Sequence, residues 1–181
     1  EHAALAERPC DGIFRVDENG VADLFHLEVT LNAAKGRPLV ALMLANNETG
    51  VLQPVAQIGK LVRDRGMLFH VDAVQGLGKI PMDISLLNID LLTLSAHKIG
   101  GPQGVGALLF KPGIEIHPQI LGGGQELGLR AGTQNVAGIV GFGVAVDTLS
   151  EQQGKFRHIK ILRDRMEADI KALAPQIGRA S

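Results

Sequence analysis

The sequence predicts an α/β protein with a mostly parallel sheet and flanking helices. Continuous apolar runs at residues 39–45, 67–71 and 91–94 have the length and composition of buried strands. Between the first two runs, residues 54–65 place apolar side chains on one helical face and charges on the other, and Gly66 follows as a helix stop. Strand, helix and strand in this order form a right-handed parallel crossover.

The segment before this crossover is expected to contain two short helices and one strand. Residues 1–8 have a helical pattern, and residues 13–16 have the pattern of a strand that ends in the turn 17–20. Apolar residues at helical spacing then predict a second helix from residue 21 to about residue 31.

Beyond the third apolar run, one more buried strand and two helices are predicted. The strand covers residues 107–110, and a loop-rich stretch follows it. A helix is expected from a capping residue, Thr133 or Asn135, to about residue 149, and its glycines indicate tight packing. The last helix is predicted from about Lys155 to Leu173, with charges on most of its surface.

Composition restricts the class of protein. The chain has 181 residues, of which 45% are hydrophobic, and a formal net charge of −1. Without a basic surplus it is expected to bind neither nucleic acid nor a membrane surface, and no apolar run approaches the roughly 20 residues of a membrane-spanning helix. The single cysteine, Cys10, cannot form an internal disulfide, which fits a reducing compartment and predicts a cytoplasmic protein.

Polar residues follow three of the predicted strands at the point where each strand ends. They are Asn46–Glu48 after the first strand, Asp72 and Gln75 after the second, and Ser95–Lys98 after the third. Ligands bind beyond the carboxyl ends of the strands in an open parallel sheet, so these side chains are expected to meet at one edge. Each residue alone also fits a turn, a helix cap or a solvated loop, but their coincidence at one edge favours a site.

A lysine and a carboxylate at this edge favour pyridoxal phosphate. A lysine close to a buried strand is expected to have a lowered pKa, which makes the Lys98 amine a nucleophile toward an aldehyde. The Asp72 carboxylate is expected to keep the pyridine nitrogen protonated, so that the ring accepts electrons. Ser95 and His97 are placed to donate to a phosphate, and Gln75 to donate to the ring phenolate oxygen.

The patterns of several other site classes are absent from the sequence. Its six histidines include no pair at three- to five-residue spacing, so no metal site is predicted. Neither a Gly-x-x-x-x-Gly-Lys-Ser/Thr motif nor a Gly-x-Ser-x-Gly motif occurs. The sequence therefore gives no support for a P-loop nucleotide site or for the nucleophile of an α/β-hydrolase.

Five motifs occur in order along the chain: Asn-Asn-Glu-Thr-Gly at 46–50, His-Val-Asp-Ala-Val-Gln at 70–75, Ser-Ala-His-Lys at 95–98, Gly-Gly-Gly-Gln-Glu at 122–126 and Arg-Ala-Gly-Thr at 130–133. Together they resemble cysteine desulfurases of the NifS/IscS type, which belong to the class-V aminotransferases among the fold-type I pyridoxal-phosphate enzymes. The resemblance covers nearly the whole chain and implies the large domain of that transferase fold.

The resemblance implies a role for each polar residue at the sheet edge. Lys98 matches the Schiff-base lysine of the family, and Asp72 matches the partner of the pyridine nitrogen. The contacts to the ring oxygen and to the phosphate are implied for four further residues: Asn47, Gln75, Ser95 and His97.

The resemblance also implies roles for two residues outside this sheet edge, one at the face of the cofactor ring and one at the partner subunit. His2 lies in a Glu-His pair similar to the family's, whose histidine stacks on the cofactor and assists proton transfer. Thr133 matches a threonine that reaches the phosphate in the partner subunit, which implies a homodimer. The family removes sulfur from L-cysteine, leaving L-alanine and an enzyme persulfide. The implied partners are therefore a sulfur-acceptor or iron–sulfur scaffold protein.

Some parts of the family pattern have no counterpart among these residues. Cys10 does not match the persulfide-forming cysteine, and the arginine that binds the substrate carboxylate is not found. We therefore expect a large domain that is incomplete at both ends, with residues 1–150 as its partial cofactor-binding part. Residues 151–181 are then a helix leading toward a missing small C-terminal domain. A selenocysteine lyase, another class-V aminotransferase and a non-catalytic cofactor-binding remnant remain alternatives.

Overall fold

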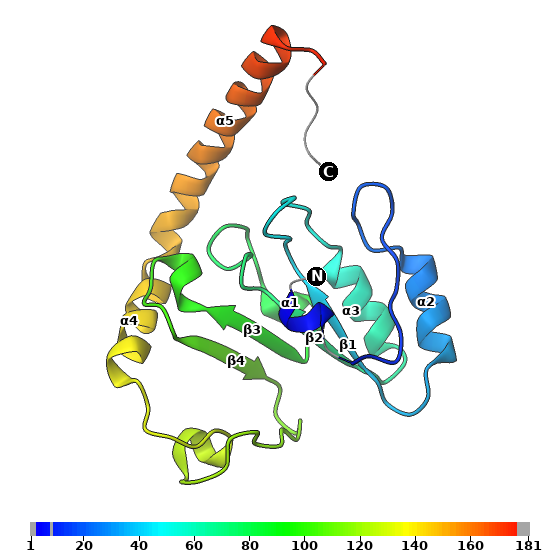
Figure 1. Ribbon diagram of the computed structural model, residues 1–181, viewed down its shortest axis with the longest axis vertical. Helices are drawn as coiled ribbons and strands as arrows, with labels where there is room; N and C mark the ends of the chain where they lie inside the picture. The colour runs from blue at the N-terminus through cyan, green and yellow to red at the C-terminus, as the bar shows by residue number, and fades with distance from the viewer. Residues whose placement is uncertain (1–2, 8, 177–181) are drawn as a thin grey trace.

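The computed structural model describes residues 3–7 and 9–176 of the chain (Figure 1). Its centre is one sheet with the strand order β1-β2-β3-β4. Strands β1 to β3 are parallel to one another, and β4 is antiparallel to β3. This arrangement confirms the mostly parallel sheet. The strands are β1 Leu39–Met43, β2 Leu68–Asp72, β3 Leu91–Ser95 and β4 Gly106–Phe110.

Helix α3, Val55–Arg63, makes the predicted crossover between β1 and β2. Pro54 precedes its first turn, where the ring removes an N–H that would have no helical partner, and Lys60 and Arg63 lie in the last turn near the carbonyl end of the dipole. Gly66 has a φ of +66°, which only glycine adopts freely, and it turns the chain into β2.

In the first half of the chain, one predicted helix has different bounds and one predicted strand does not form. Helix α2 covers Leu24–Ala33 rather than residues 21–31, because the Asp23 side chain caps it by accepting from the His26 N–H at 3.0 Å. The strand predicted at residues 13–16 is wrong. Only an isolated bridge joins Val16 to Ala22, and the segment instead lies against the start of α2, where Arg15 O accepts from the Asp23 N–H at 2.9 Å.

The main core lies between α2, α3 and one face of β1, β2 and β3. Because side chains alternate along a strand, every second residue of each strand reaches these helices. Contact between α3 and β2 and between α2 and α3 closes this layer. The core side chains from the strands are Val40, Leu42, Phe69, Val71 and Leu92, and those from the helices are Leu27, Leu31, Val55, Ile58 and Val62.

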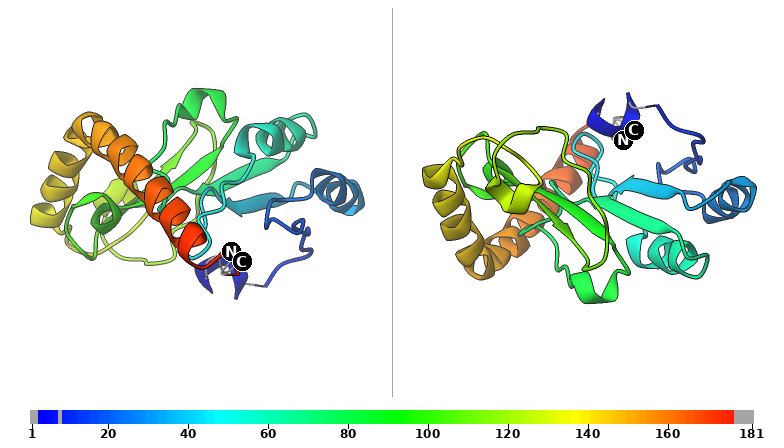
Figure 2. Two further views of the ribbon diagram at one scale, coloured as in Figure 1. Left: turned by 90° about the horizontal axis from the view of Figure 1, so that it is seen from above. Right: turned by 90° about the horizontal axis from the view of Figure 1, so that it is seen from below.

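A second, smaller core holds helix α4, Val136–Asp147, against the loop before β4. Asn135 caps this helix by accepting from the Gly138 N–H at 3.1 Å. A Cβ at Gly138 would lie 2.4 Å from Val105, and one at Gly141 would lie 2.6 Å from Pro102, so both glycines permit the expected close packing. Figure 2 shows α2 and α4 at opposite ends of the sheet.

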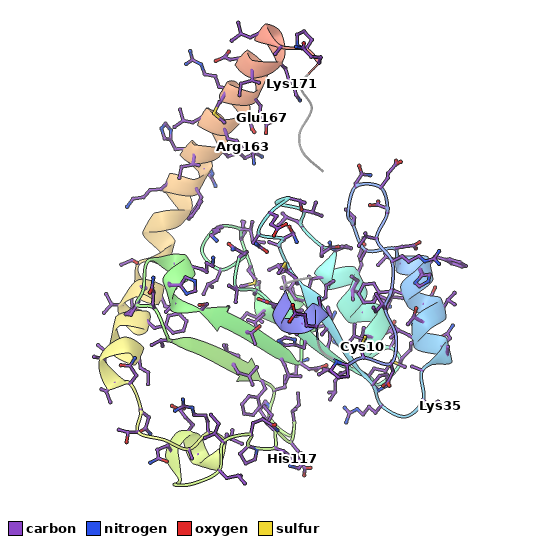
Figure 3. The ribbon with its side chains drawn as sticks, viewed as in Figure 1. Cys10, Lys35, His117, Arg163, Glu167 and Lys171 are labelled. Atoms are coloured by element: carbon purple, nitrogen blue, oxygen red, sulfur yellow. The ribbon has the colours of Figure 1, made fainter. Side chains whose placement is uncertain are left out.

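Two features of the second half differ from expectation. Strand β4 is largely exposed rather than buried, because it is the edge strand and no described element covers it. Helix α5 begins at Leu149, earlier than predicted, and continues to Leu173. It extends away from the sheet, as Arg163, Glu167 and Lys171 show in Figure 3. The short helices are α1 Ala3–Ala6, η1 Ile84–Leu86, η2 Ala96–Ile99 and η3 Gln125–Gly128.

Candidate active site

The carboxyl ends of β1, β2 and β3 meet at one edge of the sheet, as predicted. The register pairs Asp72 with Met43 on one side and with Thr93 on the other. Phe69, Val71 and Leu92 fill the core beneath α3, so by alternation Asp72 and Thr93 face the opposite side of the sheet. That opposite face carries the polar side chains His70, Asp72, Thr93 and Ser95.

Asp72 is half-buried and is oriented by the backbone that follows it. Its Oδ1 accepts from the Val74 N–H at 3.0 Å, as an aspartate does at the start of a turn. Beneath it, His70 Nε2 and Thr93 Oγ1 lie 3.2 Å apart in a hydrogen bond. Burial lowers the pKa of His70, and the negative charge of Asp72 opposes this shift in part. Asp72 therefore presents a carboxylate above a histidine that stays neutral.

Ser95 and His97 form a pair of hydrogen-bonding groups at the end of β3. Ser95 Oγ lies 2.9 Å from His97 Nδ1 across the start of η2. The turn is held by backbone bonds from Ala96 N to Val105 O at 3.0 Å and from Gly101 N to Ala96 O at 2.9 Å. When a hydroxyl and a neutral imidazole are hydrogen-bonded to each other in this way, one of the two keeps a hydrogen that it can donate to an anion.

Lys98 follows this pair within η2 and its side chain is exposed. The low-dielectric surroundings expected for it from the sequence are not found among the described residues. Gly100, with a φ of +87°, ends η2 and turns the chain away. An accessible amine beside the carboxyl edge is the chemical requirement for covalent capture of an aldehyde.

A second lysine near this edge, Lys79, has a pKa that is shifted by burial. The sequence analysis did not identify this residue. Its Nζ donates to Gln75 Oε1 at 2.5 Å, and the side chain is half-buried. Burial lowers the pKa of Lys79, and the positive charge of Lys98 lowers it further. The spacing of four residues between Gln75 and Lys79 was the available signal, since such residues are neighbours on a helical turn.

Asn47 lies in an exposed turn after β1 whose shape is set by its neighbour. Asn46 Oδ1 accepts from the backbone N–H groups of Glu48 and Thr49, each at 2.9 Å. Asn47 is exposed in this turn, which follows the carboxyl end of β1, the strand that pairs with the strand of Asp72.

None of the described hydrogen bonds ties Thr133 to this edge. It lies in the exposed connection between η3 and α4. The described bonds of this loop are internal, from Ala131 N to Ile120 O at 3.1 Å and from Gly132 N to Gln125 Oε1 at 3.3 Å. His2, the remaining predicted site residue, falls outside the described residues.

The donor set at this edge fits pyridoxal phosphate. An amine for the aldehyde, a carboxylate for the ring nitrogen, amides for the ring oxygen and a hydroxyl–imidazole pair for the phosphate come from three neighbouring strand ends. Within the described residues, no group of three or more His, Cys, Asp or Glu side chains is arranged to hold a metal ion. Among the same residues, no helix is both long and apolar enough to cross a membrane.

Comparisons with known proteins extend over most of the chain. Residues 12–177 match the sequence profile described as aminotransferase class-V. The chain is 46% identical over 161 residues to a cysteine desulfurase of a Nostoc species, covering 88% of this chain and 40% of that protein. It is 43% identical over 166 residues to the cysteine desulfurase IscS of Rickettsia typhi, covering 90% of this chain and 40% of that protein.

A solved structure agrees with these sequence matches. The X-ray structure of a NifS-like protein from Rickettsia africae superposes with a TM-score of 0.91 at 40% identity, over 95% of this chain and 49% of that one. The chain thus spans about 40% of the length of the curated relatives it matches. The fold is shared with that structure over nearly all of this chain.

Proposed function

This chain belongs to the aminotransferase class-V family, and from that premise we propose that it forms the cofactor-binding part of a pyridoxal-phosphate-dependent cysteine desulfurase. The proposed reaction converts L-cysteine and an enzyme thiol into L-alanine and an enzyme persulfide. One observation carries the proposal: Asp72, the Ser95–His97 pair and Lys98 lie at adjoining strand ends on one edge of the sheet. The relatives named cysteine desulfurase support the choice of substrate.

Pyridoxal phosphate is the cofactor of this family, and when bound it supplies a ring that accepts the electrons released at the substrate's alpha carbon. Lys98 Nζ is proposed to hold the cofactor aldehyde covalently. The Asp72 carboxylate is proposed to hold a proton on the ring nitrogen, which keeps the ring electron-accepting. Ser95 and His97 would donate to the phosphate, while Asn47 and Gln75 would donate to the ring oxygen.

Two further residues complete the proposed site. His2 would stack on the ring, and Thr133 would reach the phosphate of a second subunit in a homodimer. In support of the second role, the Thr133 loop is exposed and its described hydrogen bonds are internal, so its side chain is available to another chain. We further propose a cytoplasmic enzyme that passes sulfur to an acceptor or an iron–sulfur scaffold protein.

Cys10 is proposed to take no part in sulfur transfer. It is exposed on the segment between α1 and the Asp17 turn, labelled in Figure 3, and none of the described hydrogen bonds joins that segment to the carboxyl edge. A thiolate must reach the substrate sulfur to gain the advantage of intramolecular attack. Substituting Cys10 by Ser should therefore leave turnover unchanged.

The test is product analysis on the intact protein. With pyridoxal phosphate, dithiothreitol and L-cysteine, alanine and sulfide should form in equal amounts, in wild type and in Cys10→Ser alike. Absence of both products would contradict the proposal. Activity on L-selenocysteine but not on L-cysteine would instead establish the selenocysteine lyase alternative. Sulfide release that depends on Cys10 would show that the assigned position of the reacting thiol is wrong.

A further inference from the structure

The segment that joins Gln75 to Lys79 is a tight turn built directly on the end of β2. Backbone bonds run from Gly76 N to Ala73 O at 2.9 Å and from Lys79 N to Gly76 O at 3.1 Å. Gly78, between them, has a φ of +74°, a conformation that side-chain-bearing residues rarely adopt. This geometry folds Lys79 back over Gln75 at the carboxyl edge.

Packing on both sides fixes the turn. A Cβ at Gly76 would lie 2.5 Å from Leu44 Cδ2, just beyond β1, and one at Gly78 would lie 2.6 Å from Leu149 Cδ2, at the start of α5. The turn therefore packs between these two leucines, whose Cδ2 atoms would have to move to admit a Cβ at either glycine. Its side chains are held by the surrounding structure rather than placed by a loose loop.

The hydrogen bond from Lys79 decides which end of the Gln75 amide faces the site. An ammonium group has three donors and no acceptor, so only the amide oxygen of Gln75 can meet it. The Gln75 Nε2, with its two N–H groups, must then point away from Lys79. This assignment follows from the chemistry of the pair and does not depend on distinguishing N from O in the amide.

We propose that Lys79 is a positioning residue for the cofactor: it holds the Gln75 amide so that Nε2 donates to the anionic ring oxygen of pyridoxal phosphate. The inference rests on the proposed function, which puts that ring at this edge. Without Lys79 the amide is free to rotate, and its oxygen would repel the ring oxygen in one of its two orientations. The hydrogen bond from Lys79 thereby fixes the orientation of the Gln75 amide, with Nε2 as the donor toward the ring.

The surroundings of Lys79 support this role. The ammonium is half-buried, and burial together with the charge of Lys98 lowers its pKa, so the position disfavours a charged side chain. A lysine that only needed solvation would be better placed outward. Lys60 is such a case, with an exposed side chain that pairs with Asp64 four residues later on the outer surface of α3.

The test measures cofactor affinity by equilibrium dialysis in the intact protein. Lys79→Met should raise the Kd for pyridoxal phosphate about tenfold, the scale of one hydrogen bond. Lys79→Arg, which keeps the donor, should restore most of the affinity, and Lys60→Met should match wild type. In a Gln75→Leu background, Lys79→Met should have no further effect, because the two residues act as one unit.

A spectroscopic readout separates positioning from stability. A donor on the ring oxygen favours its anionic form, so removing it should raise the pH at which absorption by the bound cofactor changes, by the same amount in Lys79→Met and Gln75→Leu. The inference is wrong if Lys79→Met behaves like Lys60→Met, or if the Lys79 and Gln75 effects add, which would mean direct contact of Lys79 with the ligand. If wild type forms no adduct on Lys98, the proposed function itself fails.

Discussion

The two faces of strands β2 and β3 differ in polarity although neighbouring residues of the same strands supply both. On the face toward α3, Phe69 and Val71 are fully buried and Leu92 is 1% exposed. On the other face, Asp72 and Ser95 are half-buried and polar. The first set determines that the sheet forms, and the second determines what its edge can bind. A register shift of one residue would exchange the two sets and destroy both.

This contrast separates substitutions into two kinds. Substitutions on the polar face and its edge should reduce cofactor binding or turnover without changing the free energy of unfolding. Substitutions on the apolar face should lower the free energy of unfolding. The predictions for Lys98, Asp72 and Phe69 each include a control residue from elsewhere in the chain, so a mixed result would show where the separation fails.

The largest effect is expected at Lys98. Borohydride should trap pyridoxal phosphate on the Lys98 side chain of the intact protein, and Lys98→Ala should abolish the trapped adduct because the neighbouring amine, Lys79, is held by its hydrogen bond to Gln75. Mass spectrometry of peptides locates the adduct. Lys111→Ala, at the far end of β4, should retain it, and an adduct found on Lys60, Lys79 or Lys111 would contradict the assignment.

Asp72→Asn should keep the cofactor but lose turnover by roughly 100-fold or more, the scale of a preorganised electrostatic contact. An amide cannot hold the ring nitrogen protonated as a carboxylate does. Bound cofactor is measured by absorbance and turnover by alanine formation. Asp90, which pairs with Lys111 at 3.1 Å at the opposite edge of the sheet, provides the control, since Asp90→Asn should alter stability but not turnover.

On the apolar face, Phe69→Ala should lower the free energy of unfolding by about 3–5 kcal/mol, because it leaves a cavity in the core beneath α3. Phe25→Ala, on the outer side of α2 where the ring is 75% exposed, should change it by less than about 0.5 kcal/mol. Urea denaturation of the intact protein measures both. A comparable loss in the two variants would show that burial does not set the stability here.

The smallest effect concerns His70, which lies on the polar face but is buried enough to stay neutral. Because its pKa in the folded state is lowered below the ordinary value of 6.5, the unfolded chain binds the proton first on acidification. Neutral His70 therefore contributes fully to folding stability above about pH 6.5, and this contribution is lost as the pH falls below that value. Between about pH 7.5 and 5.5, His70→Gln should lose less stability than wild type, measured by the urea midpoint.

An equal loss in wild type and His70→Gln would assign the acid sensitivity to other groups. The same variant also bears on the candidate site, because His70 is hydrogen-bonded to Thr93, which lies beside Asp72. A change in cofactor affinity in the same variant would indicate that His70 supports the edge as well.

The sequence was sufficient for features that depend on local pattern. Apolar runs located β1, β2 and β3, and the spacing of Ile58 and Val62 located α3, because burial repeats with the period of each element. The edge residues followed from topology, since parallel strands end on one side. The same reasoning failed for residues 13–16, whose strand pattern has no described partner strand.

Contacts between side chains from different turns were beyond sequence reasoning. Lys79 is prominent only because two glycines let its turn pack against Leu44 and Leu149, and neither leucine is close to it in sequence. The exposure of Lys98 and of β4 similarly depends on what covers them in three dimensions. The roles of His2 and Thr133 and the domain boundary near residue 150 stay predictions.

The contact of Leu149 with Gly78 gives helix α5 a mechanical property. A straight helix of 25 residues is about 37 Å long, and α5 is anchored at its first residue against the turn that carries Lys79. A change in the direction of α5 would move Leu149. Through the contact of Leu149 with Gly78, that movement would act on the turn that carries the Gln75–Lys79 hydrogen bond.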